Sequence, residues 1–229
     1  MTVTTVYPDA DPESNTVDGA TIHDVGAGGA DWSVLVAAAG TTPAAAVDDD
    51  AVKINIAGWD EDPTSNKWRG IERGIILFNN PSIDAGDTIT AATISLYGQL
   101  KGTSAGDPTC KIYSSNPASD TAIVAGDYDS LGSTSFTDTT LLGSNLDLSD
   151  FNDWVLNSNG LANINKDAIS KWGFRDATYD VADSAPTHIG GGPDMNIRIW
   201  SADEDQSGDR RPKLAITHGL AFTPKVIMF

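Results

Sequence analysis

The fold is decided by the segment Ile71-Glu-Arg-Gly-Ile-Ile-Leu-Phe-Asn-Asn-Pro-Ser-Ile-Asp-Ala-Gly-Asp-Thr-Ile-Thr-Ala-Ala-Thr-Ile-Ser-Leu-Tyr-Gly98. Its apolar run, Ile75-Ile-Leu-Phe78, predicts a central strand that is covered on both faces. Further along, Ile94 and Leu96 fall on one face of an expected strand, and polar residues fall on the other. The Asn, Pro, Asp and Gly residues between these two parts are typical of turns. The segment therefore predicts two β-strands joined by a tight connection.

Similar strand patterns recur along the whole chain, separated by Gly- and Pro-containing turns. Two stretches, 149–156 and 159–170, favour short helices. We therefore predict an all-β sandwich of two antiparallel sheets with one or two short helices, formed by residues 1–219 and followed by an apolar tail, 220–229. The expected strands are 3–7, 21–25, 32–37, 52–57, 70–78, 88–100, 109–113, 171–175, 196–200, 212–217 and 222–227.

The charge of the chain excludes several classes of partner. It has 32 acidic residues against 14 basic ones, a net charge of −18, and 28 of the acids are Asp. Such a surface repels nucleic-acid phosphates and anionic lipid headgroups, so neither nucleic acid nor a membrane is expected as a partner. Two causes of the charge stay open: Asp-rich turns, or adaptation to high salt. The sequence contains no apolar run of about 18 residues and no secretory leader pattern at its start.

The best metal-binding pattern is Asp203-Glu-Asp-Gln-Ser-Gly-Asp209. Its alternating oxygen-bearing side chains, Asp203, Asp205, Ser207 and Asp209, match the first half of a calcium-binding loop, and Gly208 suits its sharp turn. The bidentate Glu that ends such a loop is replaced by Leu214, so that ligand would have to come from elsewhere. The stretch is therefore either a solvated acidic hairpin before the last core strand or a Ca²⁺ site.

Two of the six tryptophans, Trp59 and Trp68, flank the acidic stretch 60–66. Their rings could form a platform on which a sugar stacks, or they could pack in the core. Trp154, Trp172 and Trp200 lie in segments that favour the core.

No catalytic pattern stands out. The stretch Gly102-Thr-Ser-Ala-Gly106 resembles a nucleophile elbow, but a strand is expected after it where that motif needs a helix. His23, His188 and His218 are scattered, so neither a zinc site nor a catalytic triad is expected. The single Cys110 excludes an intrachain disulfide and favours a buried strand position. We therefore predict that the protein is not an enzyme.

The tail Phe222-Thr-Pro-Lys-Val-Ile-Met-Phe229 is apolar at a chain end, where polar residues are usual. Left exposed, it would promote aggregation. It is expected to be covered by its own sheet or by a neighbouring subunit. The candidate contact residues are Phe222, Val226, Ile227 and Phe229. Coverage by a neighbouring subunit would make the protein a homo-oligomer.

Several of these segments resemble one family. The stretch 71–98, the closing strand Arg211-Pro-Lys-Leu-Ala-Ile-Thr217 and the opening Tyr7-Pro-Asp-Ala-Asp-Pro-Glu-Ser14 resemble jelly-roll β-sandwiches of the DNRLRE type, relatives of carbohydrate-binding modules. The middle, 149–175, is similar to versions found in tailed-virus virions. The chain departs from the family where Leu77-Phe-Asn79 replaces a usual Arg-Phe-Asp ending.

The resemblance implies a jelly-roll fold and a non-enzymatic virion structural protein, such as a capsid decoration, a turret or a tail or fibre component. Its expected partners are other virion proteins, further copies of itself and host-surface polysaccharide, and its expected location is the virion, assembled in the host cytoplasm. Calcium is common in the related modules. Two alternatives remain: a secreted, extracellular carbohydrate-binding module, and a calcium-dependent polysaccharide hydrolase.

Overall fold

The structure is a computed structural model. It describes residues 1–26, 28–37, 67–80, 83–187, 195–203 and 210–220, and the course of the backbone over 51–57. The strands are β1 (Thr2–Val6), β2 (Asp18–Asp24), β3 (Ala51–Ala57), β4 (Gly70–Asn79), β5 (Asp87–Thr103), β6 (Thr109–Ser115), β7 (Leu131–Ser135), β8 (Leu141–Leu142), β9 (Phe151–Val155), β10 (Ile169–Asp176), β11 (Met195–Trp200) and β12 (Lys213–Leu220). The helical pieces are α1 (Trp32–Ala37), η1 (Ala125–Ser130), η2 (Gly143–Asn145), α2 (Ser158–Ala162) and η3 (Ala177–Val181).

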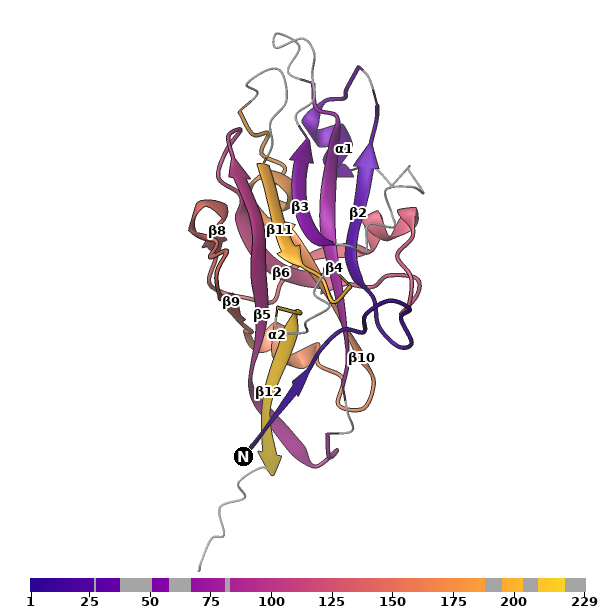
Figure 1. Cartoon of the computed structure of the whole chain (residues 1–229), viewed down its shortest axis with the longest axis vertical. Helices are drawn as coiled ribbons and strands as arrows, with labels where there is room; N and C mark the ends of the chain where they lie inside the picture. The colour runs from indigo at the N-terminus through magenta and orange to yellow at the C-terminus, as the bar shows by residue number, and fades with distance from the viewer. Residues whose placement is uncertain are drawn as a thin grey trace, which may run out of the picture.

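The strands form two antiparallel sheets that share β5 (Figure 1). Sheet A has the order β1-β12-β5-β9. Sheet B continues from the second part of β5 through β11, β3, β4, β10, β6 and β7, with β2 also paired to β4 and β8 to β6. The 17 residues of β5 serve both sheets: it pairs with β12 and β9 up to Tyr97 and with β11 from Gly98 onward. The predicted all-β sandwich with short helices is confirmed.

The main core lies between the sheets. Both contribute apolar side chains to it, including Ile94 and Leu96 of β5 and Trp154 of β9 from sheet A, and Phe174 of β10 from sheet B. Trp154 meets Phe174 edge to face, with ring centroids 5.6 Å apart. Because the strands alternate, each sends every second side chain into this layer.

Strand β4 is buried on both faces, as its apolar run predicts. Ile76 and Phe78 belong to the main core, whereas Ile75 and Leu77 pack on the other side with Val17 and Leu131. The outer face of sheet B is therefore also covered, here by the N-terminal segment and the chain around η1 and β7.

Three local predictions were wrong. Residues 32–37 form helix α1, not a strand; Trp32 and Leu35 are both buried, and their three-residue spacing places them on one helical face. Residues 149–156 contain strand β9, not a helix, and its buried positions alternate. The expected helix at 159–170 is only the short α2, capped by Asn157, whose side chain accepts a hydrogen bond from Gly160 N. The expected strand 222–227 lies outside the described residues.

Among the helices that the structure describes, none combines the length and the apolar character needed to cross a membrane.

Candidate functional site

The best candidate for cation binding joins two distant segments. Asp203 follows β11, while Asp11 and Glu13 lie in the loop after β1, and carboxylate oxygens of the three residues lie within 4.8 Å of one another. The backbone N–H of Asp11 donates to Asp203 Oδ1 across 192 residues of sequence. The predicted ligand Asp203 is therefore part of an acidic group, which we define as Asp11, Glu13 and Asp203.

The acidic group is electrostatically unfavourable on its own. Partial burial raises the pKa of Glu13, and the neighbouring carboxylates of Asp11 and Asp203 raise it further. A hard divalent cation would relieve this repulsion, and carboxylate oxygens are the ligands that calcium prefers. The other predicted ligands, Asp205, Ser207 and Asp209, lie outside the described residues. Sequence reasoning missed Asp11 and Glu13 because no local spacing links them to Asp203.

A shallow hollow of about 410 Å³ lies in the same N-terminal region, and we call it the Tyr7 hollow. The guanidinium carbon of Arg211 is 4.8 Å from the centre of the Tyr7 ring, and this ring is 41 % exposed. Asp9 is held on the rim: burial raises its pKa, but hydrogen bonds from Ser14 and Asn15 outweigh burial and lower it. The lining residues are Val6, Tyr7, Pro8, Asp9, Ala10, Ser14, Asn79 and Arg211.

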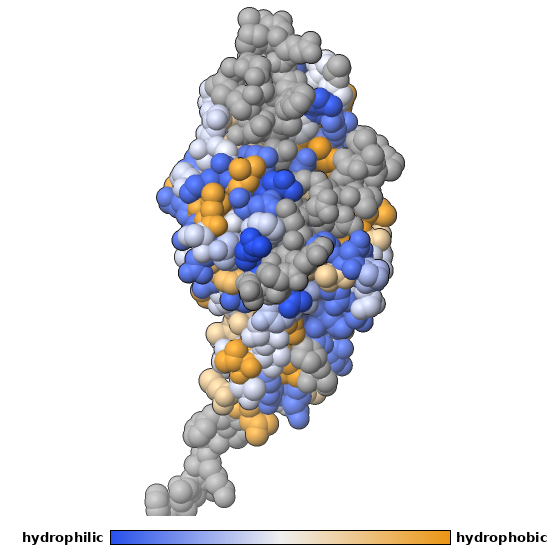
Figure 2. All heavy atoms as spheres, viewed as in Figure 1, coloured by the Kyte–Doolittle hydropathy of each residue, from blue (hydrophilic) through white to orange (hydrophobic). Residues whose placement is uncertain are grey.

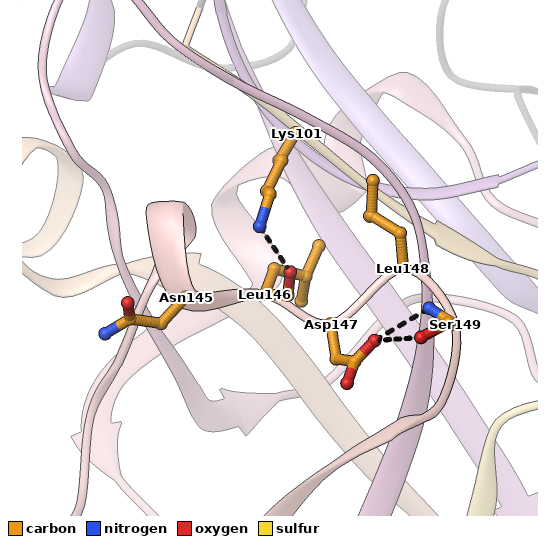
Figure 3. A pocket seen from close by; sticks show the side chains of 6 residues that line it. All are labelled: Lys101, Asn145, Leu146, Asp147, Leu148 and Ser149. Carbon is orange, nitrogen blue, oxygen red and sulfur yellow. Dashed lines mark hydrogen bonds between the residues drawn. The ribbon is translucent and has the colours of Figure 1, made fainter.

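A second hollow, of about 490 Å³, lies beside η2 (Figure 3). Its polar groups already bind the loop that forms it. Lys101 Nζ donates to the carbonyls of Ser144 and Leu146, and the Asp147 carboxylate accepts from both N and Oγ of Ser149. These bonds fix the loop and leave the hollow a weak candidate for ligand binding.

The predicted sugar platform is at odds with the position of Trp68. Its side chain is only 2 % exposed, and its ring meets Trp32 of α1 edge to face at 5.3 Å. The β-bridge between Ala30 and Trp68 places Trp68 next to the start of helix α1. The Trp68 ring therefore packs in the protein interior, where a sugar cannot stack on it, because the apolar helix face covers it. Trp59 lies outside the described residues.

A polar chain crosses sheet A near its β1 edge. Thr4 Oγ1 is 3.0 Å from His218 Nε2, and His218 Nδ1 is 2.7 Å from Asp87 Oδ2. Hydroxyl, imidazole and carboxylate stand in the order of a nucleophile, a base and its orienting acid. None of the three residues lines either of the two hollows described above. Sequence reasoning missed this chain because its members come from three strands that meet only in the sheet.

Three buried charged residues form an ion cluster, defined as Arg73, Arg175 and Asp180, on the outer face of sheet B. Both guanidiniums form ion pairs with the Asp180 carboxylate, with closest contacts of 2.6 Å from Arg73 and 2.7 Å from Arg175. Their remaining N–H groups donate to backbone carbonyls, among them that of Tyr128. Burial raises the pKa of Asp180, but the two arginines outweigh it and lower the pKa.

This ion cluster links several elements of the fold. The Arg73 guanidinium also lies 3.8 Å over the Tyr128 ring, and Tyr128 donates its hydroxyl to the Leu35 carbonyl of α1. The cluster thus ties β4, β10 and η3 to the short helices that cover them. The signal available in the sequence was Arg73, which stands with Glu72 just before the apolar run 75–78.

Apolar side chains are exposed where the two ends of the described chain meet. Met1 is 92 % exposed, Val3 63 % and Leu220 82 %. The register pairs Thr2 with His218, so these three residues lie at the same end of β1 and β12. Figure 2 shows apolar surface at this narrow lower end of the molecule. The predicted contact residues Phe222, Val226, Ile227 and Phe229 lie outside the described residues.

No protein-family model matches this chain, and no curated protein matches its sequence.

Proposed function

We propose that this protein is a non-enzymatic structural component of a tailed-virus particle, placed as a capsid decoration, a turret or a part of the tail or its fibres. The observation that carries the proposal is the apolar surface of Met1, Val3 and Leu220 at one end of an otherwise strongly acidic molecule. Such a surface fits a protein that is buried in an assembly. The resemblance to virion-associated jelly rolls supports the same role, and the net charge of −18 fits a saline habitat.

The location can be tested on particles. The gene should lie among capsid and tail genes, and mass spectrometry of purified virions should find the chain in a constant ratio to the capsid protein. A gene beside hydrolases, together with the chain in the medium and not in particles, would favour a secreted carbohydrate-binding module.

The proposal assigns a structural role to the Thr4–His218–Asp87 chain, which links three neighbouring strands through side-chain contacts. We expect the protein to hydrolyse a nitrophenyl ester no faster than its His218→Gln variant does. Turnover by the parent chain that the variant loses would instead support a hydrolase.

Glycan recognition is a second candidate function, located at the Tyr7 hollow. A half-exposed aromatic ring beside an arginine and the Asp9 carboxylate offers both a stacking face and hydrogen-bonding groups for a sugar. On an array of host-surface polysaccharides, Tyr7→Ala should abolish binding, whereas Tyr97→Ala, which removes an aromatic ring from β5, should retain it. Equal binding by both variants would rule out this hollow.

Calcium is the cofactor that we propose for the acidic group. Titration with Ca²⁺ should release or absorb heat and raise the melting temperature of the parent chain. Asp203→Asn should remove both effects, and Asp129→Asn, which alters an exposed carboxylate of η1, should keep them. A parent chain that shows neither heat nor a thermal shift binds no calcium.

A further inference from the structure

Among the residues that the structure describes, strand β1 is an edge strand of sheet A. It pairs with β12 through five consecutive residues without irregularity, and no other strand of the described residues pairs with it. Every residue of β1, Thr2-Val-Thr-Thr-Val6, is β-branched, the type that best suits extended strands. An edge of this kind presents a row of backbone N–H and C=O groups that another strand can bind.

The opposite edge of the same sheet carries protection that β1 lacks. Strand β9 contains the exposed Asp153 and follows the exposed Asp147 and Asp150. Charges at an edge repel a second strand and are a common defence against edge-to-edge pairing. The stretch from Met1 to Tyr7 contains no charged side chain, and β1 itself contains no proline. In a chain with 32 acidic residues, this uncharged edge stands out.

The surface beside the β1 edge adds apolar area. Val3 points away from the core on the strand itself, and Met1 lies against Gly219, next to the exposed Leu220. An added strand would therefore gain backbone hydrogen bonds from β1 and apolar contacts from these side chains. This combination is the one used when sheets extend across a protein–protein interface.

We infer that the β1 edge binds the β1 edge of a second copy, so that two A sheets join as one across a two-fold axis. The net charge of the chain favours a second copy as the partner at this edge. Two copies, each with a net charge of −18, can approach closely only where neither presents acids, and β1 is such a place. An antiparallel pair that uses all five residues is centred on Thr4. It sets Val3 opposite Thr5 of the second copy, and Thr2 opposite its Val6.

This inference deepens the assembly part of the proposed function, and it does not use the tail residues Phe222 to Phe229. The two can therefore fail separately. A chain that is monomeric in solution but abundant in virions would overturn the β1 pairing alone, whereas a dimer absent from virions would overturn the proposed location alone.

The decisive measurement is the mass of the full chain by light scattering over a wide range of concentration. We expect a dimer that dissociates on dilution. Val3→Glu combined with Thr5→Glu would set two glutamates opposite each other twice in the interface, and should raise the dissociation constant by roughly tenfold or more. Both residues are exposed, so the fold should persist, which circular dichroism checks.

Two further variants make the test specific. Val3→Lys combined with Thr5→Glu sets opposite charges face to face in the Thr4-centred register and should restore the dimer. Val155→Glu places a charge on the other edge of sheet A, where Val155 is 58 % exposed, and should leave the mass unchanged. A parent chain that is monomeric at every concentration, or a dimer that Val155→Glu disrupts and the double glutamate variant does not, would overturn the inference. A charge-swapped variant that stays monomeric would overturn the register.

Discussion

The two faces of sheet B are both buried, but they are built from different chemistry. On the inner face, Ile76 of β4 and Phe174 of β10 pack into an apolar layer against sheet A. On the outer face, Arg73 and Arg175 of the same strands hold Asp180, alongside a smaller apolar group around Ile75. An apolar layer tolerates small changes of shape, whereas a buried ion cluster depends on every partner, because a charge left alone in the interior is costly.

The largest effect is expected at Asp180. Asp180→Ala leaves two buried guanidiniums without a counter-charge and should lower the free energy of unfolding by about 3–5 kcal/mol, measured by denaturant titration. Asp180→Asn keeps the shape and should retain most of this loss, because the charge is what the arginines require. An Asp180→Asn variant that is as stable as the parent would show that the charge of Asp180 does not stabilise the fold.

The next largest effect is a pH dependence of the folding stability, caused by Asp176 at the end of β10. Burial raises its pKa to about 6, against the restraining effect of backbone N–H groups of Thr178, Thr109 and Tyr179. The folded state therefore holds this proton more tightly than the unfolded chain, whose Asp has a pKa near 3.8. Stability from this group is present at low pH and falls by roughly 3 kcal/mol as pH rises from about 4 to above 6.

The substitution Asp176→Asn tests whether the stability from this group falls as pH rises. The asparagine does not titrate, so the stability of the variant relative to the parent should improve between pH 4 and pH 7. Unfolding measured at both pH values gives the comparison. A constant difference between the two proteins would show that Asp176 has an ordinary pKa in the folded state.

A matched pair on β4 compares the apolar parts of the two faces. Ile75 and Ile76 are adjacent, fully buried, and point to opposite sides. Ile75→Val and Ile76→Val should each cost about 0.5–1.5 kcal/mol. An outer-face variant with no measurable cost would mean that the segments covering this face pack loosely.

The smallest effect is expected at the surface. Lys67 Nζ lies 2.7 Å from Asp31 Oδ1, but both side chains are substantially exposed. Asp31→Asn should change the free energy of unfolding by less than about 1 kcal/mol, because water and salt screen the pair. A larger loss, comparable with that of Asp180→Asn, would contradict the distinction between buried and exposed charge pairs.

The sequence predicted the strands well where their pattern was local and strong. The apolar run at 75–78 and the alternation at Ile94 and Leu96 both correspond to observed burial. It failed at Trp32, where a short apolar stretch fits a strand or a helix equally, and at β9, where polar residues around Trp154 hid a period of two. Among the candidate site residues, the acidic spacing singled out Asp203, whose metal binding stays a prediction. The sequence left Trp68 open between a sugar platform and the core, and the structure places its side chain in the interior.

By itself, the sequence determined the all-β sandwich, since alternation between neighbouring residues is enough to define a strand and its buried face. The tertiary structure decided which polar groups meet. Arg73 reaches Asp180 across 107 residues, and Asp11 reaches Asp203 across 192. It also decided that β1 is the edge strand of sheet A among the described residues. Those outcomes depend on strand order and register, which arise from the packing of the whole chain and leave no mark in any short stretch of sequence.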